Sequence, residues 1–136
     1  MKTVLDTNVF ISGVFFRGPP YQILKAWREG RIQLLISDEI FEEYQRVGEL
    51  LSYDYPKVDL GPFLELLAIN TEFVMPKKLQ NPVCEDPDDD KFLACAIAGK
   101  SQIIISGDKH LLKVSGYVGI KVLRPRKFVD QYLDNP

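Results

Sequence analysis

The chain has 136 residues, of which 46% are hydrophobic and 26% are charged, and its formal net charge is −2. This is ordinary globular composition, with enough residues for one domain and one hydrophobic core, and we expect a single domain over residues 1–136. The charge balance excludes a globally basic nucleic-acid-binding protein, so any binding of nucleic acid would need a local cluster of cations.

Three further features bear on where the protein works. No apolar stretch reaches the length of a membrane-spanning helix, so we expect no membrane partner. The chain enters a predicted strand at Lys2, so we expect no signal peptide. Cys84 and Cys95 lack the spacing of a metal site and are expected to be free thiols in a reducing cytosol. Together these features predict a cytoplasmic protein.

Apolar strands and amphipathic helices alternate along the chain. Strands are predicted over 2–5, 31–36, 72–75, 103–105 and 118–123. Helices are predicted over about 21–29, 38–51 and 60–70, from Asp90 onward, and from Pro125 onward, with a short helical turn at 109–112. Residues 9–16 form an apolar segment that is helical or extended. Long connections between strands imply a parallel sheet flanked by helices, so the expected fold is a three-layer α/β/α sandwich with a mainly parallel, twisted central sheet.

Two aspartates directly follow predicted strands. Asp6 follows the first strand, and Asp108 follows the strand at 103–105. In an α/β sheet, ligands bind beyond the carboxyl ends of the strands. The first strand of such a sheet is commonly central, and if the strand at 103–105 is its neighbour, the two carboxylates lie close together. A plain helix cap is the alternative interpretation of Asp6.

A third aspartate opens the helix that leads into the strand at 103–105. From Asp90, the positions four and seven residues on are Ala94 and Ile97, so Asp90 is expected at the end of a stripe that faces the core. A carboxylate that points inward needs a partner or a metal. Asp88 and Asp89 are expected to form a solvated cap cluster, although either could share the role given to Asp90.

One glutamate falls among core positions of the helix at 38–51. On a helical wheel, Glu43 lies inside the apolar arc, between Val47 and Leu50. Buried glutamates are unusual. Glu43 therefore either belongs to a site or pairs with a buried lysine or arginine.

Several ionised carboxylates cannot lie together without a cation, because like charges raise one another's pKa. Oxygen ligands suit Mg²⁺ or Mn²⁺, and the sequence has no cysteine–histidine set for zinc. A metal ion held by carboxylates can activate a water molecule against a phosphodiester. The acids thus favour metal-assisted hydrolysis.

At this point the chain resembles the PIN domain family. The resemblance rests on TVLDTNVFISG, on Ser37 followed six residues later by Glu43, on DPDDDKFLACAIAGK and on IIISGDKHLL. It extends from Lys2 to about Leu133, and within the family the chain is similar to the toxin-like PIN ribonucleases of bacterial and archaeal toxin–antitoxin systems. Each motif alone is weak, but the four in this order and spacing are fairly specific.

The resemblance implies a Mg²⁺- or Mn²⁺-dependent endoribonuclease that hydrolyses RNA phosphodiester bonds, as the toxin of a toxin–antitoxin system. The catalytic residues that it implies are Asp6, Glu43, Asp90 and Asp108. Of these, Asp6, Asp90 and Asp108 would hold the metal, and Glu43 would join them or take a proton from the attacking water. Asn8 and Ser106 would orient the carboxylates as hydrogen-bond partners.

The partners implied are an RNA substrate and, in addition, a cognate antitoxin or a second copy of the chain. Lys109 and Lys113 follow Asp108 closely and are the expected RNA-binding residues. A catalytically silent PIN-fold RNA-binding or scaffold protein is the main alternative. A haloacid-dehalogenase-like phosphatase is disfavoured because it needs a second aspartate two residues after Asp6, where the chain has Asn8. A phosphoacceptor receiver domain is disfavoured because it needs paired acids after the first strand and a lysine after the last, and neither is convincing in this chain.

Overall fold

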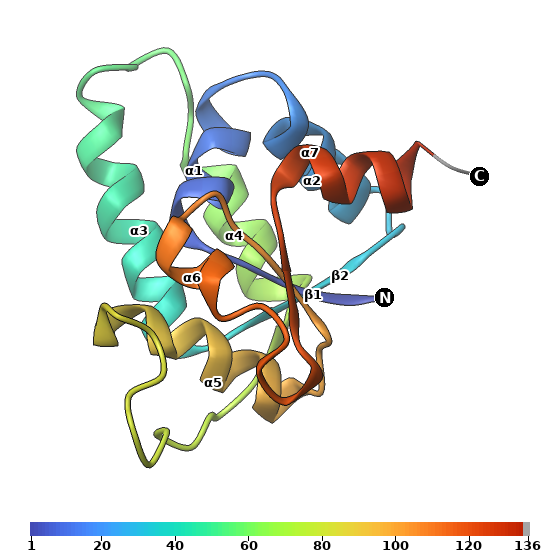
Figure 1. The fold of residues 1–136 in the computed structure, drawn as a ribbon. Helices are drawn as coiled ribbons and strands as arrows, with labels where there is room; N and C mark the ends of the chain where they lie inside the picture. The colour runs from blue at the N-terminus through green and yellow to red at the C-terminus, as the bar shows by residue number, and fades with distance from the viewer. Residues whose placement is uncertain (135–136) are drawn as a thin grey trace.

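The computed structural model describes residues 1–134 and has a parallel β-sheet at its centre (Figure 1). Five strands lie in the order β3-β2-β1-β4-β5, and every neighbouring pair is parallel. The strands are β1 (Lys2–Leu5), β2 (Gln33–Ile36), β3 (Glu72–Phe73), β4 (Ile103–Ile105) and β5 (Lys121–Leu123). The central place of β1 and its pairing with β4 are confirmed, and the expected three-layer α/β/α fold is confirmed with them.

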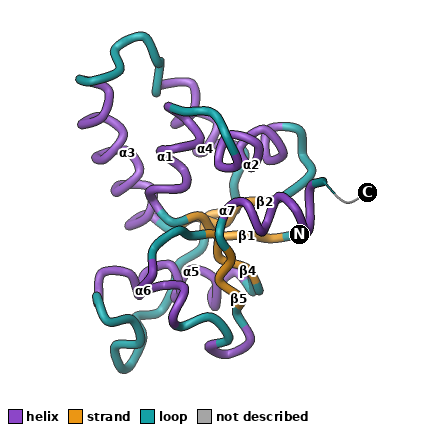
Figure 2. The backbone as a smooth tube through the Cα atoms, turned by 45° about the horizontal axis from the view of Figure 1, so that its top comes forward, coloured by secondary structure: helices purple, strands orange, loops and turns teal. Residues whose placement is uncertain are grey.

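Helices cover both faces of this sheet. They are α1 (Thr7–Phe15), α2 (Pro19–Arg28), α3 (Asp38–Ser52), α4 (Gly61–Ile69), α5 (Asp90–Gly99), α6 (Lys109–Lys113) and α7 (Pro125–Phe128). Short helical segments η1 (Pro87–Asp89), η2 (Tyr117–Gly119) and η3 (Val129–Leu133) complete the chain. Figure 2 shows α1, α2, α4 and α7 on one side of the strands and α5 and α6 on the other.

The structure resolves one segment that the sequence left open, and some predicted strands are shorter than expected. The apolar segment after Asp6, left open between helix and extended chain, is helix α1. The last strand is shorter than expected, because η2 occupies its first residues and Val118 has a positive φ of 43° that a strand cannot contain. The strand expected to reach Met75 ends at Phe73. None of these differences moves the carboxyl ends of β1 and β4.

The core lies between the sheet and the helices on each side. Its strands are short and apolar, and β4 consists of three buried isoleucines, as expected for a sheet covered on both faces. Cys84 and Cys95 are buried free thiols, as predicted. Over residues 1–134, no helix combines the length and the apolar character needed to cross a bilayer.

Candidate metal centre

The first acid of the site, Asp6, lies where β1 ends and α1 begins. One carboxylate oxygen caps α1 by accepting a hydrogen bond from the backbone N–H of Val9 at 2.9 Å. The other accepts a hydrogen bond from the hydroxyl of Ser106. The helix cap that was the alternative for Asp6 is therefore present, and Asp6 nevertheless faces a neighbouring strand's end. Asp6 is only 5% exposed.

Ser106 joins the ends of the two central strands. Its Oγ donates to Asp6 and accepts from the backbone N–H of Asp108 at 2.9 Å. Asp108 in turn caps α6, because its carboxylate accepts from the backbone N–H of His110 at 2.8 Å. The pairing of β1 with β4 therefore brings Asp6 and Asp108 together through one fully buried hydroxyl.

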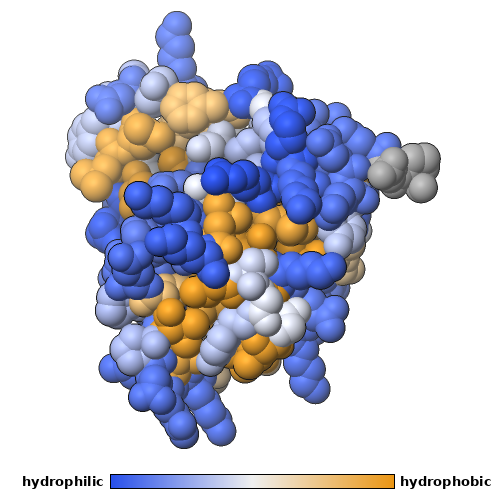
Figure 3. Space-filling view, in the orientation of Figure 1, coloured by the Kyte–Doolittle hydropathy of each residue, from blue (hydrophilic) through white to orange (hydrophobic). Residues whose placement is uncertain are grey.

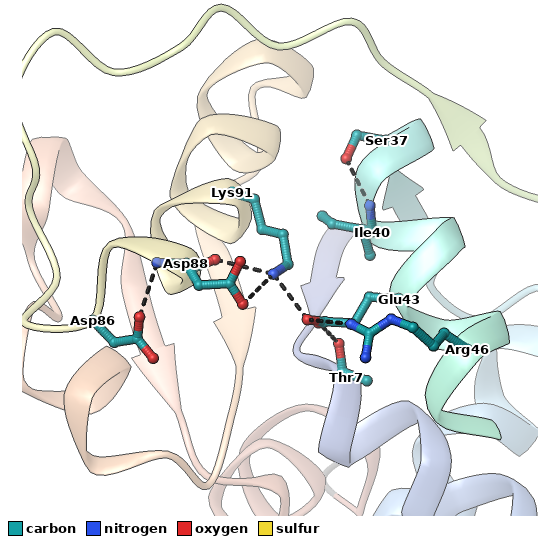
Figure 4. A network of polar contacts seen from close by, with 8 residues as sticks. All are labelled: Thr7, Ser37, Ile40, Glu43, Arg46, Asp86, Asp88 and Lys91. Atoms are coloured by element: carbon teal, nitrogen blue, oxygen red, sulfur yellow. Dashed lines mark hydrogen bonds and ion pairs between the residues drawn. The ribbon is translucent and has the colours of Figure 1, made fainter. Parts of the chain in front are cut away.

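Glu43 projects from α3 toward the same region and is held from two sides (Figure 4). Lys91 Nζ lies 2.9 Å from Glu43 Oε1, and the hydroxyl of Thr7 donates to Oε2. Arg46 approaches Oε1 at 3.8 Å from the solvent side. The buried lysine partner that the sequence left open as an alternative is present. The Glu43 side chain is 16% exposed and still lines the acid pocket described below.

Lys91 is a functional candidate that the sequence reasoning missed. It is only 8% exposed and its ammonium group contacts Glu43, the Asp88 carboxylate at 2.9 Å and the Asp88 carbonyl at 3.0 Å. Burial lowers the pKa of Lys91, but the hydrogen bonds to Asp88 and Glu43 outweigh it and raise the pKa overall. A lysine in the first turn of an almost wholly apolar helix was the available signal, because such a cation requires acidic partners.

The orientation of α5 differs from the sequence prediction. The prediction that Ile97 faces the core is wrong, because Ile97 is 43% exposed, whereas Ala94 of the same predicted stripe is buried. Phe92 and Leu93, almost fully buried, continue instead from Asp89 one helical turn earlier. Asp90 faces the preceding loop, where its two oxygens accept backbone N–H groups of Val83 at 3.0 Å and Cys84 at 2.7 Å.

Acidic side chains line a pocket of about 160 Å³, which we call the acid pocket. It is lined by Asp6, Thr7, Asn8, Glu43, Val47, Asp89, Phe92 and Asp108. Asp90 is not among these residues. The structure therefore brings together three of the four predicted acids, Asp6, Glu43 and Asp108, and adds Asp89 to them.

The electrostatics of the acid pocket indicate crowded negative charge. The pKa of Asp6 is raised, first by burial and then by the carboxylates of Asp108 and Glu43, against the hydrogen bonds from Ser106 and Val9. The pKa of Asp89 is raised to about 6, first by burial and then by the Asp108 carboxylate. Asp89 Oδ2 is buried and has no hydrogen-bond partner.

These residues fit a hard divalent cation. The side chains around the pocket offer carboxylate oxygens, and the one orphaned buried oxygen points to a missing positive partner. Within the part of the chain that the structure describes, no three histidine, cysteine, aspartate or glutamate side chains already stand in a ready metal-ligating group. Ligation would therefore require the carboxylates to close on the ion.

A pH-dependent stability follows from the raised pKa of Asp89. A folded pKa of about 6 against an ordinary 3.8 means that the folded protein holds this proton more tightly than the unfolded chain. The resulting stabilisation is complete below the ordinary pKa and is lost as pH rises through about 6, on the order of 1–2 kcal/mol after solvent screening. In EDTA, the melting temperature should fall between about pH 5 and about pH 7.5.

Asp89→Asn should remove much of this fall, whereas Asp90→Asn, the adjacent control, should keep it. Thermal unfolding in EDTA across this pH range measures both effects. An equal pH dependence in wild type and Asp89→Asn would contradict the assignment of the proton to Asp89.

Of the remaining predicted residues Asn8, Lys109 and Lys113, Asn8 alone lines the acid pocket. Asn8 is exposed and lines the pocket, but no hydrogen bond from its side chain to a carboxylate is present in residues 1–134. Lys109 is exposed beside Asp108. Lys113 lies 3.6 Å from Glu85, which also contacts His110 at 3.0 Å.

An all-parallel sheet with carboxylates at the ends of its two central strands defines a class of α/β proteins that carry an acidic site at this edge. Comparison with known proteins makes the class specific. A family model of the PIN domain matches residues 2–110. An uncharacterized protein of Methanocaldococcus jannaschii is 35% identical over 148 residues, which cover 97% of this chain and 92% of that protein.

The chain therefore belongs to the PIN domain family. PIN domains are generally nucleases, so a nuclease-type hydrolase function and a nucleic-acid substrate are what the family suggests. The archaeal relative's description gives no activity, and so the expected role as a toxin stays a prediction.

Proposed function

We propose that this protein is a metal-dependent endoribonuclease whose Mg²⁺ or Mn²⁺ ion is held by Asp6, Asp89 and Asp108. The observation that carries the proposal is the convergence on one pocket of the acids that follow β1 and β4, an acid of α3 and the last acid of η1. The raised pKa of Asp6 and the unpartnered oxygen of Asp89 support it. Both mark a carboxylate whose negative charge is not fully compensated by a nearby cation.

The third ligand position is given to Asp89 in place of Asp90. Asp89 lines the acid pocket, whereas both oxygens of Asp90 are engaged by the backbone of Val83 and Cys84. The predicted role of Asp90 nevertheless stays open to experiment, and the two neighbouring aspartates make a matched pair for it.

Each remaining residue of the site has a definable task in this proposal. A bound divalent ion would supply an activated water and charge neutralisation at the scissile phosphate. Ser106 fixes the orientation of Asp6 and links it to Asp108. Glu43, steadied by Lys91 and Thr7, accepts the proton of the attacking water. Lys109, which is exposed and directly follows Asp108, contacts RNA phosphate, and Lys113 does so after release from Glu85.

The central test is an RNA-cleavage assay with and without metal. We expect cleavage with Mg²⁺ or Mn²⁺, products that carry 5′-phosphates, and loss of cleavage in EDTA. Cleavage that persists in EDTA would contradict a metal-dependent mechanism. RNA binding without turnover in every metal would favour the silent RNA-binding protein that the sequence left as an alternative.

The proposed role as a toxin rests on the family resemblance, as do the cognate antitoxin and the homodimer. The cytoplasmic location rests on the sequence features given above. Hydrophobic side chains reach the surface between charged ones on the face drawn in Figure 3. Large hydrophobic side chains that are exposed include Tyr53, Ile69 and Met75. Such surface is compatible with a protein partner, but it does not select between an antitoxin and a second copy of the chain.

A further inference from the structure

A second pocket, larger than the acid pocket, lies next to it, and we call it the side pocket. Its volume is about 700 Å³, which is in the range of small-molecule and nucleotide sites. It is formed between the beginning of α5, Glu39 of α3 and the loop that spans residues 76–82. Nothing proposed above for the nuclease site uses this space.

An ion pair joins a residue that lines one pocket to a residue that lines the other (Figure 4). Lys91 lines the side pocket, and its Nζ lies 2.9 Å from Oε1 of Glu43, which lines the acid pocket. The consecutive residues Asp88 and Asp89 likewise line one pocket each. A polynucleotide strand whose phosphate lies at the acid pocket would therefore place an adjoining nucleotide at the side pocket.

The loop contributes two lysines to the lining of the side pocket. Lys77 and Lys78 are exposed, and neither forms an ion pair with any residue in 1–134. Two of the acids in its wall are already engaged, Asp88 by Lys91 and Asp90 by backbone N–H groups. Glu39, on α3, is the remaining acid. The loop thus offers two available cations in a protein of net charge −2.

Part of the wall of the side pocket is apolar. Leu79, Ala94 and the rings of Pro76, Pro82 and Pro87 line it. Flat apolar surface of this kind suits the face of a nucleobase, and the ammonium groups of the loop lysines suit the phosphate that follows it. A free phosphate would leave the apolar walls uncovered, and an apolar peptide would leave the lysines unused.

We infer that the side pocket binds one nucleotide of the RNA strand next to the scissile phosphate. The base lies against Leu79 and the prolines, and the adjoining phosphate contacts Lys77 and Lys78. This inference rests on the proposed function, since it takes RNA as the substrate, but RNA binding can be measured without metal and without cleavage.

The test is fluorescence anisotropy of a labelled short oligouridylate in EDTA at about 50 and about 200 mM salt. Lys77→Ala combined with Lys78→Ala should raise Kd at least about tenfold and reduce the slope of log K against log salt by about 1.4, the value for two lost contacts to a single strand. Lys25→Ala combined with Lys127→Ala removes the same charge from α2 and α7 and should change neither quantity. Equal losses in the two double variants would overturn the inference.

A second variant tests the apolar wall. Leu79→Ala should raise Kd about threefold to tenfold and leave the salt slope unchanged, because it removes apolar contact and no charge. General attraction of RNA to the loop lysines would not produce this result. Thermal unfolding of each variant shows whether it is folded, and an unchanged Kd for folded Leu79→Ala would remove the nucleobase from the side pocket.

Failure of this inference differs from failure of the proposed function. If wild type cleaves RNA and the Lys77/Lys78 double variant binds and cleaves as well as wild type, the inference fails and the nuclease stands. If the double variant loses binding in EDTA and wild type fails to cleave RNA in the presence of Mg²⁺ or Mn²⁺, the side pocket stands and the nuclease fails.

Discussion

Asp6→Asn is expected to reduce RNA cleavage by roughly 10³-fold or more while the protein stays folded. The substitution removes a carboxylate that lies between the ends of β1 and β4. There the carboxylate accepts a hydrogen bond from Ser106 and lies close to Asp108. An amide is a poor ligand for a hard divalent ion, so both metal affinity and the neutralisation of the scissile phosphate are lost. Single-turnover cleavage at saturating Mn²⁺ measures the effect.

The same variant should not be destabilised when metal is absent. Asparagine keeps an oxygen that can accept the N–H of Val9, and it removes a buried charge whose pKa is raised by burial. In EDTA its melting temperature should equal or exceed that of wild type, and the increase on adding Mn²⁺ should be smaller than in wild type.

Asp130→Asn provides a charge-matched control, because Asp130 is exposed on η3. It should cleave as wild type does. Full activity of Asp6→Asn in metal-replete buffer would refute the assignment. The same pair of variants tests the toxin role: expression of wild type and Asp130→Asn should arrest growth, whereas Asp6→Asn should not.

The second large effect concerns two adjacent aspartates. Asp89→Asn should lower kcat by roughly 10²-fold to 10³-fold, because Asp89 lines the acid pocket and carries the buried oxygen that has no partner. Asp90→Asn should leave kcat within about threefold of wild type and lower the free energy of unfolding by about 1–2 kcal/mol. The reason is that an asparagine retains only one of the two acceptors that hold the backbone of Val83 and Cys84.

The contrast between the two variants is informative because they remove the same charge one residue apart. Cleavage kinetics and chemical unfolding, measured on both proteins, separate catalysis from stability. If catalysis is instead lost in Asp90→Asn and retained in Asp89→Asn, Asp90 binds the metal, as the sequence predicted, and Asp89 does not.

The difference between Asp89 and Asp90 shows where sequence reasoning fails in physical terms. Residues 91–96 of α5 are all buried, so the helix has no polar side in this stretch and its apolar pattern does not fix its rotation about its own axis. In addition, η1 precedes α5 and has a different number of residues per turn, which changes the directions of the side chains that lead into the helix. A rotation by one residue exchanges which aspartate faces the pocket.

Glu43 and Lys91 show a different limit. The wheel of α3 placed Glu43 among apolar positions, and its partly buried side chain in the acid pocket agrees with that placement. Its partner lies 48 residues away on α5, and local periodicity carries no information about which distant side chain meets it. The sequence therefore predicted that Glu43 could pair with a buried lysine or arginine, but it did not indicate which residue this would be.

What the sequence by itself determined was the sheet and the two acids that follow its central strands. Short apolar runs form strands wherever helices cover both faces, and the residue after such a strand must emerge at the sheet's carboxyl edge. Only the tertiary structure decided that Asp89 faces the acid pocket, that Lys91 holds Glu43, and that a loop with two lysines forms the side pocket beside them. Those outcomes depend on the rotation of a buried helix and on contacts between distant segments, which packing fixes and local sequence pattern does not.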